Sequence, residues 1–160
     1  MNINKLKLTT SLTECDKHRG YLLDALEYLQ AIIDAHDLDV FALFADKKIV
    51  LRLDQLAYRF TRMQDETGAK IMPLILELTA EPLDETATFI DKLNRLEKLG
   101  VIESALQWLE LRKVRNSLAH EYPDDPDIRF AALQELIAAT NKLIEIFERI
   151  ERYLVEKNIV

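Results

Sequence analysis

The chain has 160 residues, of which 49% are hydrophobic and 31% are charged, with only 3 glycines and 4 prolines. This composition excludes a disordered chain, and we expect residues 1–160 to form a single all-α domain, because a chain of this length can bury its own core. The net charge of −7 argues against broad binding to nucleic acid, since a surface that neutralises phosphates needs an excess of Lys and Arg. Any contact with RNA must be local, and no DNA binding is expected.

The N-terminal stretch MNINKLKL has no apolar signal core, and the longest uncharged apolar runs, at 41–45 and 71–76, are far too short to span a bilayer. The single cysteine, Cys15, cannot form an intramolecular disulfide. Its place on an apolar spacing predicts a buried, unreactive thiol. We therefore expect a cytoplasmic protein without a membrane partner.

The first predicted helix is long and amphipathic. The spacing of Ser11 and Glu14 is typical of a capping box, which predicts that the helix opens at Ser11. Apolar side chains recur along the segment at steps of three and four, namely at Leu8, Leu12, Cys15, Leu22, Leu26, Leu29 and Ile33. A mixed connection, HDLDVFALFAD, follows this helix.

A second helix is predicted to begin after Asp46, whose side chain can cap it, and its apolar stripe extends to Leu78. Gly68 and Pro73 are expected to bend or interrupt this helix.

The remaining helices are marked by the signals at their ends. A turn at 81–84 precedes a short helix that should end at Gly100, where glycine can adopt the left-handed conformation. Ser104 opens a second capping box, and Asp125 followed by Pro126 predicts the start of a long last helix. No segment has the alternation of a strand, so we predict an up-and-down bundle of four to five helices, a shape that often dimerises.

The sequence RNSLAHEY, at residues 115–122, falls at the C-terminal end of the fourth helix, just before Pro123. On an ideal wheel of about 100° per residue, Arg115 falls on the apolar arc that carries Trp108, where a core side chain is expected. Arg112 flanks the arc in a supporting position. A guanidinium among apolar groups either snorkels, forms an internal salt bridge or binds an anion in a solvated cleft, and these alternatives stay open.

His120 points about 140° away from Arg115 on an ideal helix. The two side chains converge only if the last turn unwinds before Pro123 or if a second copy of the chain brings its own pair alongside. Such a site has specific chemistry, because His acts as a general acid or base near neutral pH and Arg stabilises charge on a phosphoryl group. With the 2′-hydroxyl of RNA as the nucleophile, two His residues could cleave the strand without a metal and leave a cyclic phosphate.

Other chemistries have little support. Glu14 and His18 stand one turn apart, but no second Glu-x-x-His pair accompanies them, so no metal site is predicted. The chain has no glycine-rich phosphate loop, no GxSxG and no CxxC, and no cofactor is expected. Trp108 is predicted to be a core residue rather than a platform for stacking bases.

The segment RNSLAHEY resembles the RxxxxHxY signature of HEPN domains, in particular the toxin-type members that pair with a minimal nucleotidyltransferase antitoxin. The match comprises Arg115, Asn116, His120 and Tyr122. The resemblance implies a metal-independent endoribonuclease that acts on RNA as a homodimer, with Arg115 and His120 as the catalytic pair and Asn116 helping to shape the site. It also implies that the antitoxin attaches AMP to Tyr122, where the added charge and bulk would block RNA.

Two other interpretations fit the same residues. In the first, a non-catalytic HEPN-like subunit binds a nucleotide or a nucleotidyltransferase through the same cleft. In the second, the chain is a helical interaction module in which the motif Arg forms an internal ion pair and the motif His has no role. Arg59, Arg62, Asp65 and Glu66 are candidates for lining the cleft, and a solvated, charge-paired helix face explains them equally well.

Overall fold

The part of the chain that the computed structural model describes, residues 2–79, 83–120 and 124–160, is built of six helices and contains no β-strand. In chain order they are α1 (Ile3–Ile33), α2 (Val40–Leu43), a continuous helix made of α3 (Lys47–Glu66), the π-helical η1 (Thr67–Ile71) and α4 (Met72–Leu78), then α5 (Phe89–Leu99), α6 (Ala105–Ser117) and α7 (Pro126–Glu156). The predicted all-α fold is confirmed, and α2 adds a single turn within the expected connection.

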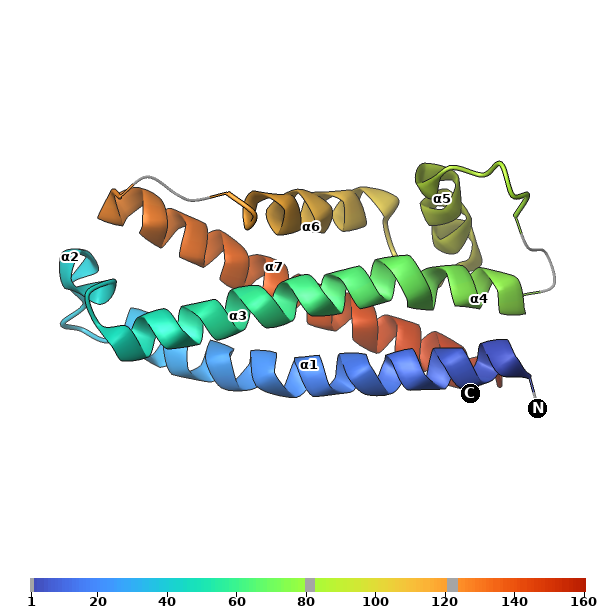
Figure 1. Ribbon diagram of the computed structural model, residues 1–160, viewed down its shortest axis with the longest axis horizontal. Coiled ribbons are helices and arrows are strands. Elements are labelled where there is room, and N and C mark those ends of the chain that lie inside the picture. Colours follow the sequence, from blue (N-terminus) through green and yellow to red (C-terminus); the bar gives the residue numbers. More distant parts are fainter. Residues whose placement is uncertain (1, 80–82, 121–123) are drawn as a thin grey trace.

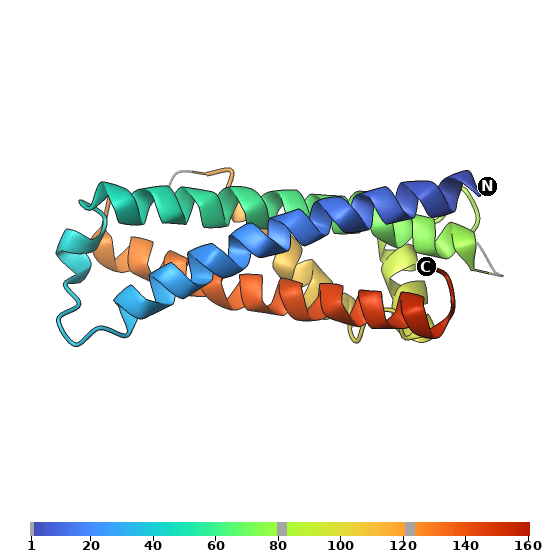
Figure 2. The ribbon, with the colours of Figure 1, turned by 90° about the horizontal axis from the view of Figure 1, so that it is seen from below.

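The helices form an up-and-down bundle (Figure 1). In this view α1 runs from right to left, the continuous helix α3–η1–α4 returns, α6 again runs to the left, and α7 returns to the right. Both termini therefore lie at the same end of the molecule, together with the short helix α5. Figure 2 shows α1 crossing the bundle obliquely while it packs along α3. None of the described helices combines the length and the apolar character needed to cross a membrane.

The start of α1 differs from the prediction. The side chain of Asn2 accepts hydrogen bonds from the backbone N–H groups of Asn4 (2.9 Å) and Lys5 (3.3 Å), and the helix begins at Ile3. Ser11 lies inside the helix and is buried. Asn is as good a capping residue as Ser, so the earlier cap determines where the helix begins, and the spacing between Ser11 and Glu14 has no capping role.

The second predicted helix begins where expected, because the Asp46 side chain accepts a hydrogen bond from the backbone N–H of Lys48 at 2.9 Å. The predicted irregularity near Gly68 takes the form of the π-helical turn η1, which contains Gly68, and the helix continues through it. Pro73 follows one turn later and lacks the N–H that an α-helix would direct at the carbonyl of residue 69, which favours a local change of helical pitch. The absence of a side chain at Gly68 makes room for the indole of Trp108, because a Cβ at this position would lie 2.9 Å from Cζ2 of Trp108.

The other helix ends follow the sequence signals. Gly100 ends α5 with φ 82°, and the N–H of Val101 bonds to the carbonyl of Leu96 at 2.9 Å, as in a glycine-terminated helix. Ser104 caps α6 and Asp125 caps α7. All these signals are local, so tertiary packing does not alter them.

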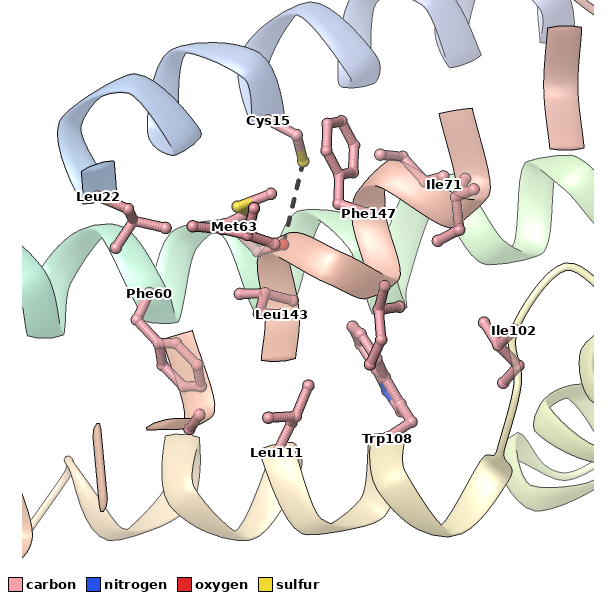
Figure 3. Packing of buried hydrophobic residues seen from close by; sticks show 14 of the residues in the cluster. Cys15, Leu22, Phe60, Met63, Ile71, Ile102, Trp108, Leu111, Leu143 and Phe147 are labelled. Atoms are coloured by element: carbon pink, nitrogen blue, oxygen red, sulfur yellow. Dashed lines mark hydrogen bonds between the residues drawn. The ribbon is translucent and has the colours of Figure 1, made fainter. Parts of the chain in front are cut away.

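One hydrophobic core joins α1, the α3–η1–α4 helix, α6 and α7 (Figure 3). Trp108 is fully buried, which confirms its predicted core position, and Leu111 lies beside it on the inner face of α6. Cys15 is fully buried too, and burial raises the pKa of its thiol to about 12. Because Trp108 and Leu111 anchor α6, its next turn presents Arg115 toward α3.

Candidate functional site

The motif RNSLAHEY spans the end of α6. The α-helix stops at Ser117, and its backbone then tightens into three-residue turns, in which the N–H of Ala119 bonds to the carbonyl of Asn116 and that of His120 to the carbonyl of Ser117, both at 3.2 Å. The motif is thus divided, with Arg115 and Asn116 in the last helical turn and His120 beyond it. Tyr122, the expected AMP acceptor, lies outside the described residues.

Arg115 forms a two-point ion pair with Asp65 of α3. Its Nε donates to Oδ1 and its Nη2 to Oδ2 of the carboxylate, each at 2.8 Å. This hydrogen bonding raises the pKa of the Arg115 guanidinium above its ordinary value. The side chain keeps 32% of its surface exposed. An arginine therefore occupies a core-facing position of α6 because a carboxylate on the neighbouring helix meets it there. Of the alternatives given for Arg115, the structure shows the salt bridge, and its partner is Asp65.

His120 is exposed and lies at the rim of a pocket of about 570 Å³. The pocket is bounded by Phe44 at the end of α2, the first half of α3, the end of α6 and the start of α7, and its lining is mostly apolar. Polar groups at its mouth are Asp124 and Arg129, which pair at 3.3 Å. Within the described ranges the His120 side chain has no hydrogen-bond partner. Its imidazole is thus accessible beside a cavity large enough for a small organic group.

No hydrogen bond or ion pair joins Arg115 to His120 in the part of the chain that the structure describes. The pocket at His120 uses Leu53 and Ala57 of α3, whereas the partner of Arg115, Asp65, follows Ala57 by eight residues. At a rise of about 1.5 Å per residue this separation is about 12 Å along the helix axis. The last turn does tighten before His120, and Arg115 and His120 lie near different parts of α3. A second copy of the chain offers another way to bring the two side chains to one site.

Arg112 and Asn116, the supporting positions, lie one turn apart on α6 and are both exposed. The guanidinium of Arg112 lies over the ring of Phe89 in α5, 4.8 Å from the ring centroid. Asn116 makes no side-chain hydrogen bond to any residue in the described ranges. These two side chains are therefore available to a ligand that approaches α6 from solvent.

Another groove, of about 850 Å³, lies between α1 and the α3–η1–α4 helix. Three of the four charged candidates on α3 either line this groove or contact a residue that lines it. Arg62 and Glu66 line that groove, and Arg59 Nη1 lies 3.1 Å from Nδ1 of His18, which also lines it. His18 is buried, and its pKa is lowered by this burial and by the neighbouring Arg59 charge. In the described part of the chain, no three His, Cys, Asp or Glu side chains gather closely enough to hold a metal ion.

Sequence reasoning missed Gln64, a polar residue with only 4% of its surface exposed. It follows the fully buried Phe60 by one helical turn, so the signal was an amide on the apolar stripe of the second predicted helix.

No family model, no curated protein and no solved structure matches this chain. The motif and its surroundings are therefore the observations that bear on function.

Proposed function

We propose that the chain is a HEPN-like endoribonuclease that needs no metal ion and acts in the cytoplasm as the toxin of a toxin–antitoxin pair. The observation that carries the proposal is the end of α6, which stops at Ser117 and leaves His120 exposed at the rim of an open pocket. An accessible imidazole is the side chain best suited to move protons near neutral pH. A histidine that only capped the helix would be expected to bond its last carbonyl groups, and His120 makes no such bond within the described ranges.

Arg115 supplies the positive charge in this proposal. Asp65 binds two of its three guanidinium nitrogens, Nε and Nη2, and thereby fixes the plane of the group. Nη1 makes no hydrogen bond to a described residue. A preorientated donor of this kind stabilises the negative charge that builds on the phosphate oxygens as the transition state forms.

The reaction is an intramolecular transesterification of RNA. One His120 takes the proton of a 2′-hydroxyl, whose oxygen attacks the adjacent phosphorus. The bond from phosphorus to the 5′-oxygen breaks, and a second His120 in its protonated form gives that oxygen a proton. The products are a 2′,3′-cyclic phosphate and a 5′-hydroxyl, so that no water, metal ion or redox partner is consumed.

The active site in this proposal is composite, with two copies of the chain contributing to one cleft. Arg115 and His120 lie near different parts of α3 within one chain, which supports it, because the two groups must reach the same phosphate. Two copies related by a two-fold axis also provide the two imidazoles that the base and acid roles require.

The test uses purified chain, single-stranded RNA and an excess of chelator. Wild type should cleave the RNA and leave cyclic phosphate ends, whereas His120→Ala should not, and its fold should be unchanged because the side chain is exposed. His36→Ala is the matched control, since His36 is an exposed histidine outside the site. Cleavage that persists in a clean preparation of His120→Ala contradicts the proposal.

A second candidate is favoured by the ion pair itself. If Arg115 serves only to join α6 to α3 through Asp65, the chain is a helical interaction module, and Arg115→Gln changes stability while no RNA is cut. A non-catalytic HEPN-like subunit differs from both, since it binds a nucleotide or a nucleotidyltransferase at the same residues without cutting RNA.

The proposed antitoxin is a small nucleotidyltransferase that modifies Tyr122. Coexpression with such an enzyme should add the mass of one AMP to the chain and abolish cleavage, and Tyr122→Phe should prevent both effects. A chain that is modified elsewhere, or is modified and still cleaves RNA, excludes this form of neutralisation.

A further inference from the structure

A third cavity, of about 440 Å³, lies beside Asp65, the partner of Arg115. It is enclosed by the end of α3 and the turn η1 on one side and by α5 and α6 on the other. Asp65 lines this cavity and also holds Arg115. The cavity therefore adjoins the guanidinium to which a phosphate is assigned above.

Gln64 gives the cavity an unused recognition group. The residue is 4% exposed and lines the cavity, and its amide makes no hydrogen bond to any residue in 2–79, 83–120 or 124–160. Buried polar side chains are normally paired. An amide presents a donor and an acceptor side by side, which is the pattern that matches the edge of a nucleobase.

The walls of the cavity suit a flat ring. The fully buried indole of Trp108 borders the cavity from the core side and packs against η1 where Gly68 has no side chain. Its Nε1 is the only fully buried side-chain nitrogen or oxygen of the described residues that has no partner. Phe89 forms another wall. Phe89 is partly exposed, so the cavity presents an aromatic surface together with the unpaired amide of Gln64.

The charge at the mouth of the cavity is positive, in a chain whose net charge is −7. Arg112 and Lys92 line the cavity, and neither makes an ion pair with a described residue. The charge of Asp65 is balanced by Arg115. The contact of Arg112 with Phe89 holds the guanidinium at the mouth. A ligand that is planar and polar at one end and anionic at the other fits this combination.

We propose that this cavity is a nucleotide-binding subsite, in which Gln64 bonds the edge of an unpaired base and Arg112 and Lys92 bind its phosphate. The inference rests on the proposed function and deepens it, because a nucleotide seated here places the neighbouring phosphodiester of an RNA strand beside Arg115. A free mononucleotide shares the same chemistry, and the experiment separates the two sources.

The probe is a short, fluorescent, single-stranded RNA with 2′-O-methyl groups throughout, which lacks the nucleophile and cannot be cut. Binding is measured by fluorescence anisotropy with the full chain. Gln64→Leu and Arg112→Gln should each weaken binding about tenfold, the effect expected from losing one good hydrogen-bonded contact to a base or phosphate. Lys113→Gln is the matched control, since it removes the same charge from the adjacent exposed position of α6, outside the cavity, and should change binding less than about twofold.

Each of the four mononucleotides is added as a competitor. Displacement of RNA by one of them, lost in Gln64→Leu, places RNA in the cavity. Mononucleotide binding that depends on Gln64, without binding of RNA, assigns the cavity to a free nucleotide. Wild-type affinity in both Gln64→Leu and Arg112→Gln, with thermal unfolding confirming that both are folded, overturns the subsite.

The results that would contradict the subsite differ from those that would contradict the ribonuclease proposal. If wild type cleaves unmodified RNA and Gln64→Leu leaves both binding and KM unchanged, the subsite is wrong and the ribonuclease proposal stands. If RNA binding depends on Gln64 but no RNA is cut, the nucleotide site stands and catalysis is wrong.

Discussion

Arg115 and Asp65 join α6 to α3 through two parallel hydrogen bonds of 2.8 Å, Nε to Oδ1 and Nη2 to Oδ2. The pair is partly open to solvent, with 32% of the arginine side chain and 44% of the aspartate side chain exposed. Exposed ion pairs typically contribute about 0–1 kcal/mol to the free energy of unfolding, because water screens them, and a two-point pair of arginine with a carboxylate belongs at the upper end of that range. The pair therefore joins the two helices and also fixes the plane of the guanidinium.

The first prediction concerns Arg115→Lys. Lysine keeps the positive charge but cannot make two parallel bonds to a carboxylate and still present a third donor. The cleavage rate should therefore fall at least about tenfold, while the free energy of unfolding, measured in urea, should change by no more than about 1 kcal/mol.

Asp65→Asn is the companion variant, because it retains Arg115 and removes the charge that orientates it. Its cleavage rate should also fall, and the double variant should lose less than the product of the two single losses, since both act through one pair. Independent effects of the two substitutions, or wild-type cleavage by Arg115→Lys, would mean that the pair is only structural.

The second prediction is a pH dependence of stability that originates at His18. Burial and the Arg59 charge lower the pKa of His18 below 6.5, so the unfolded chain binds a proton there before the folded chain does. Stability should therefore be greatest above pH 6.5 and should decline as the pH falls from 6.5 toward the pKa of the folded state. Urea titrations at a series of pH values should show this decline in wild type and a smaller decline in His18→Gln. Identical slopes for both chains contradict the assignment.

The third prediction concerns Cys15, which is fully buried and whose thiol pKa is raised to about 12. Because the thiolate is the reactive form, an aromatic disulfide reagent at mildly alkaline pH should leave the folded chain unmodified. The same reagent should titrate one thiol per chain in denaturant. Rapid modification of the folded chain would show that α1 opens readily from α3.

The fourth prediction compares two glycines in helices. A Cβ at Gly68 would lie 2.9 Å from the ring of Trp108, whereas a Cβ at Gly20 meets nothing within 4 Å. Gly68→Ala should therefore destabilise the fold by about 1–3 kcal/mol through crowding. Gly20→Ala should stabilise it by about 0.5–1 kcal/mol through helix propensity. Calorimetry or urea unfolding measures both, and a stabilising Gly68→Ala would mean that the indole shifts freely.

The sequence predicted those features of the fold that local chemistry determines. The caps at Asp46, Ser104 and Asp125, and the left-handed glycine at Gly100, each depend on a few neighbouring residues. The predicted start of α1 at Ser11 was wrong, because a capping-box spacing inside a helix looks the same as one at its N-terminal end. Asn2 is the actual cap.

The candidate site was only partly accessible from the sequence. The motif identified Arg115 and His120, but the bond of Arg115 to Asp65 joins residues 50 positions apart and depends on how α6 packs on α3. The wheel placed Arg115 and His120 on different faces, but it could not show that the α-helix ends at Ser117 and tightens into three-residue turns before His120. The sequence places Gln64 on the apolar stripe of its helix, but it does not show the cavity that lies beside this residue.

The most direct test of the central claim is the cleavage of single-stranded RNA, in the presence of a chelator, by wild type and by His120→Ala prepared side by side. Growth after induced expression of the two chains, at matched soluble yields, is the corresponding measurement in cells. The account predicts that wild type produces cyclic phosphate ends and arrests growth and that His120→Ala does neither. Equal cleavage by both chains, or cleavage by neither, would contradict it.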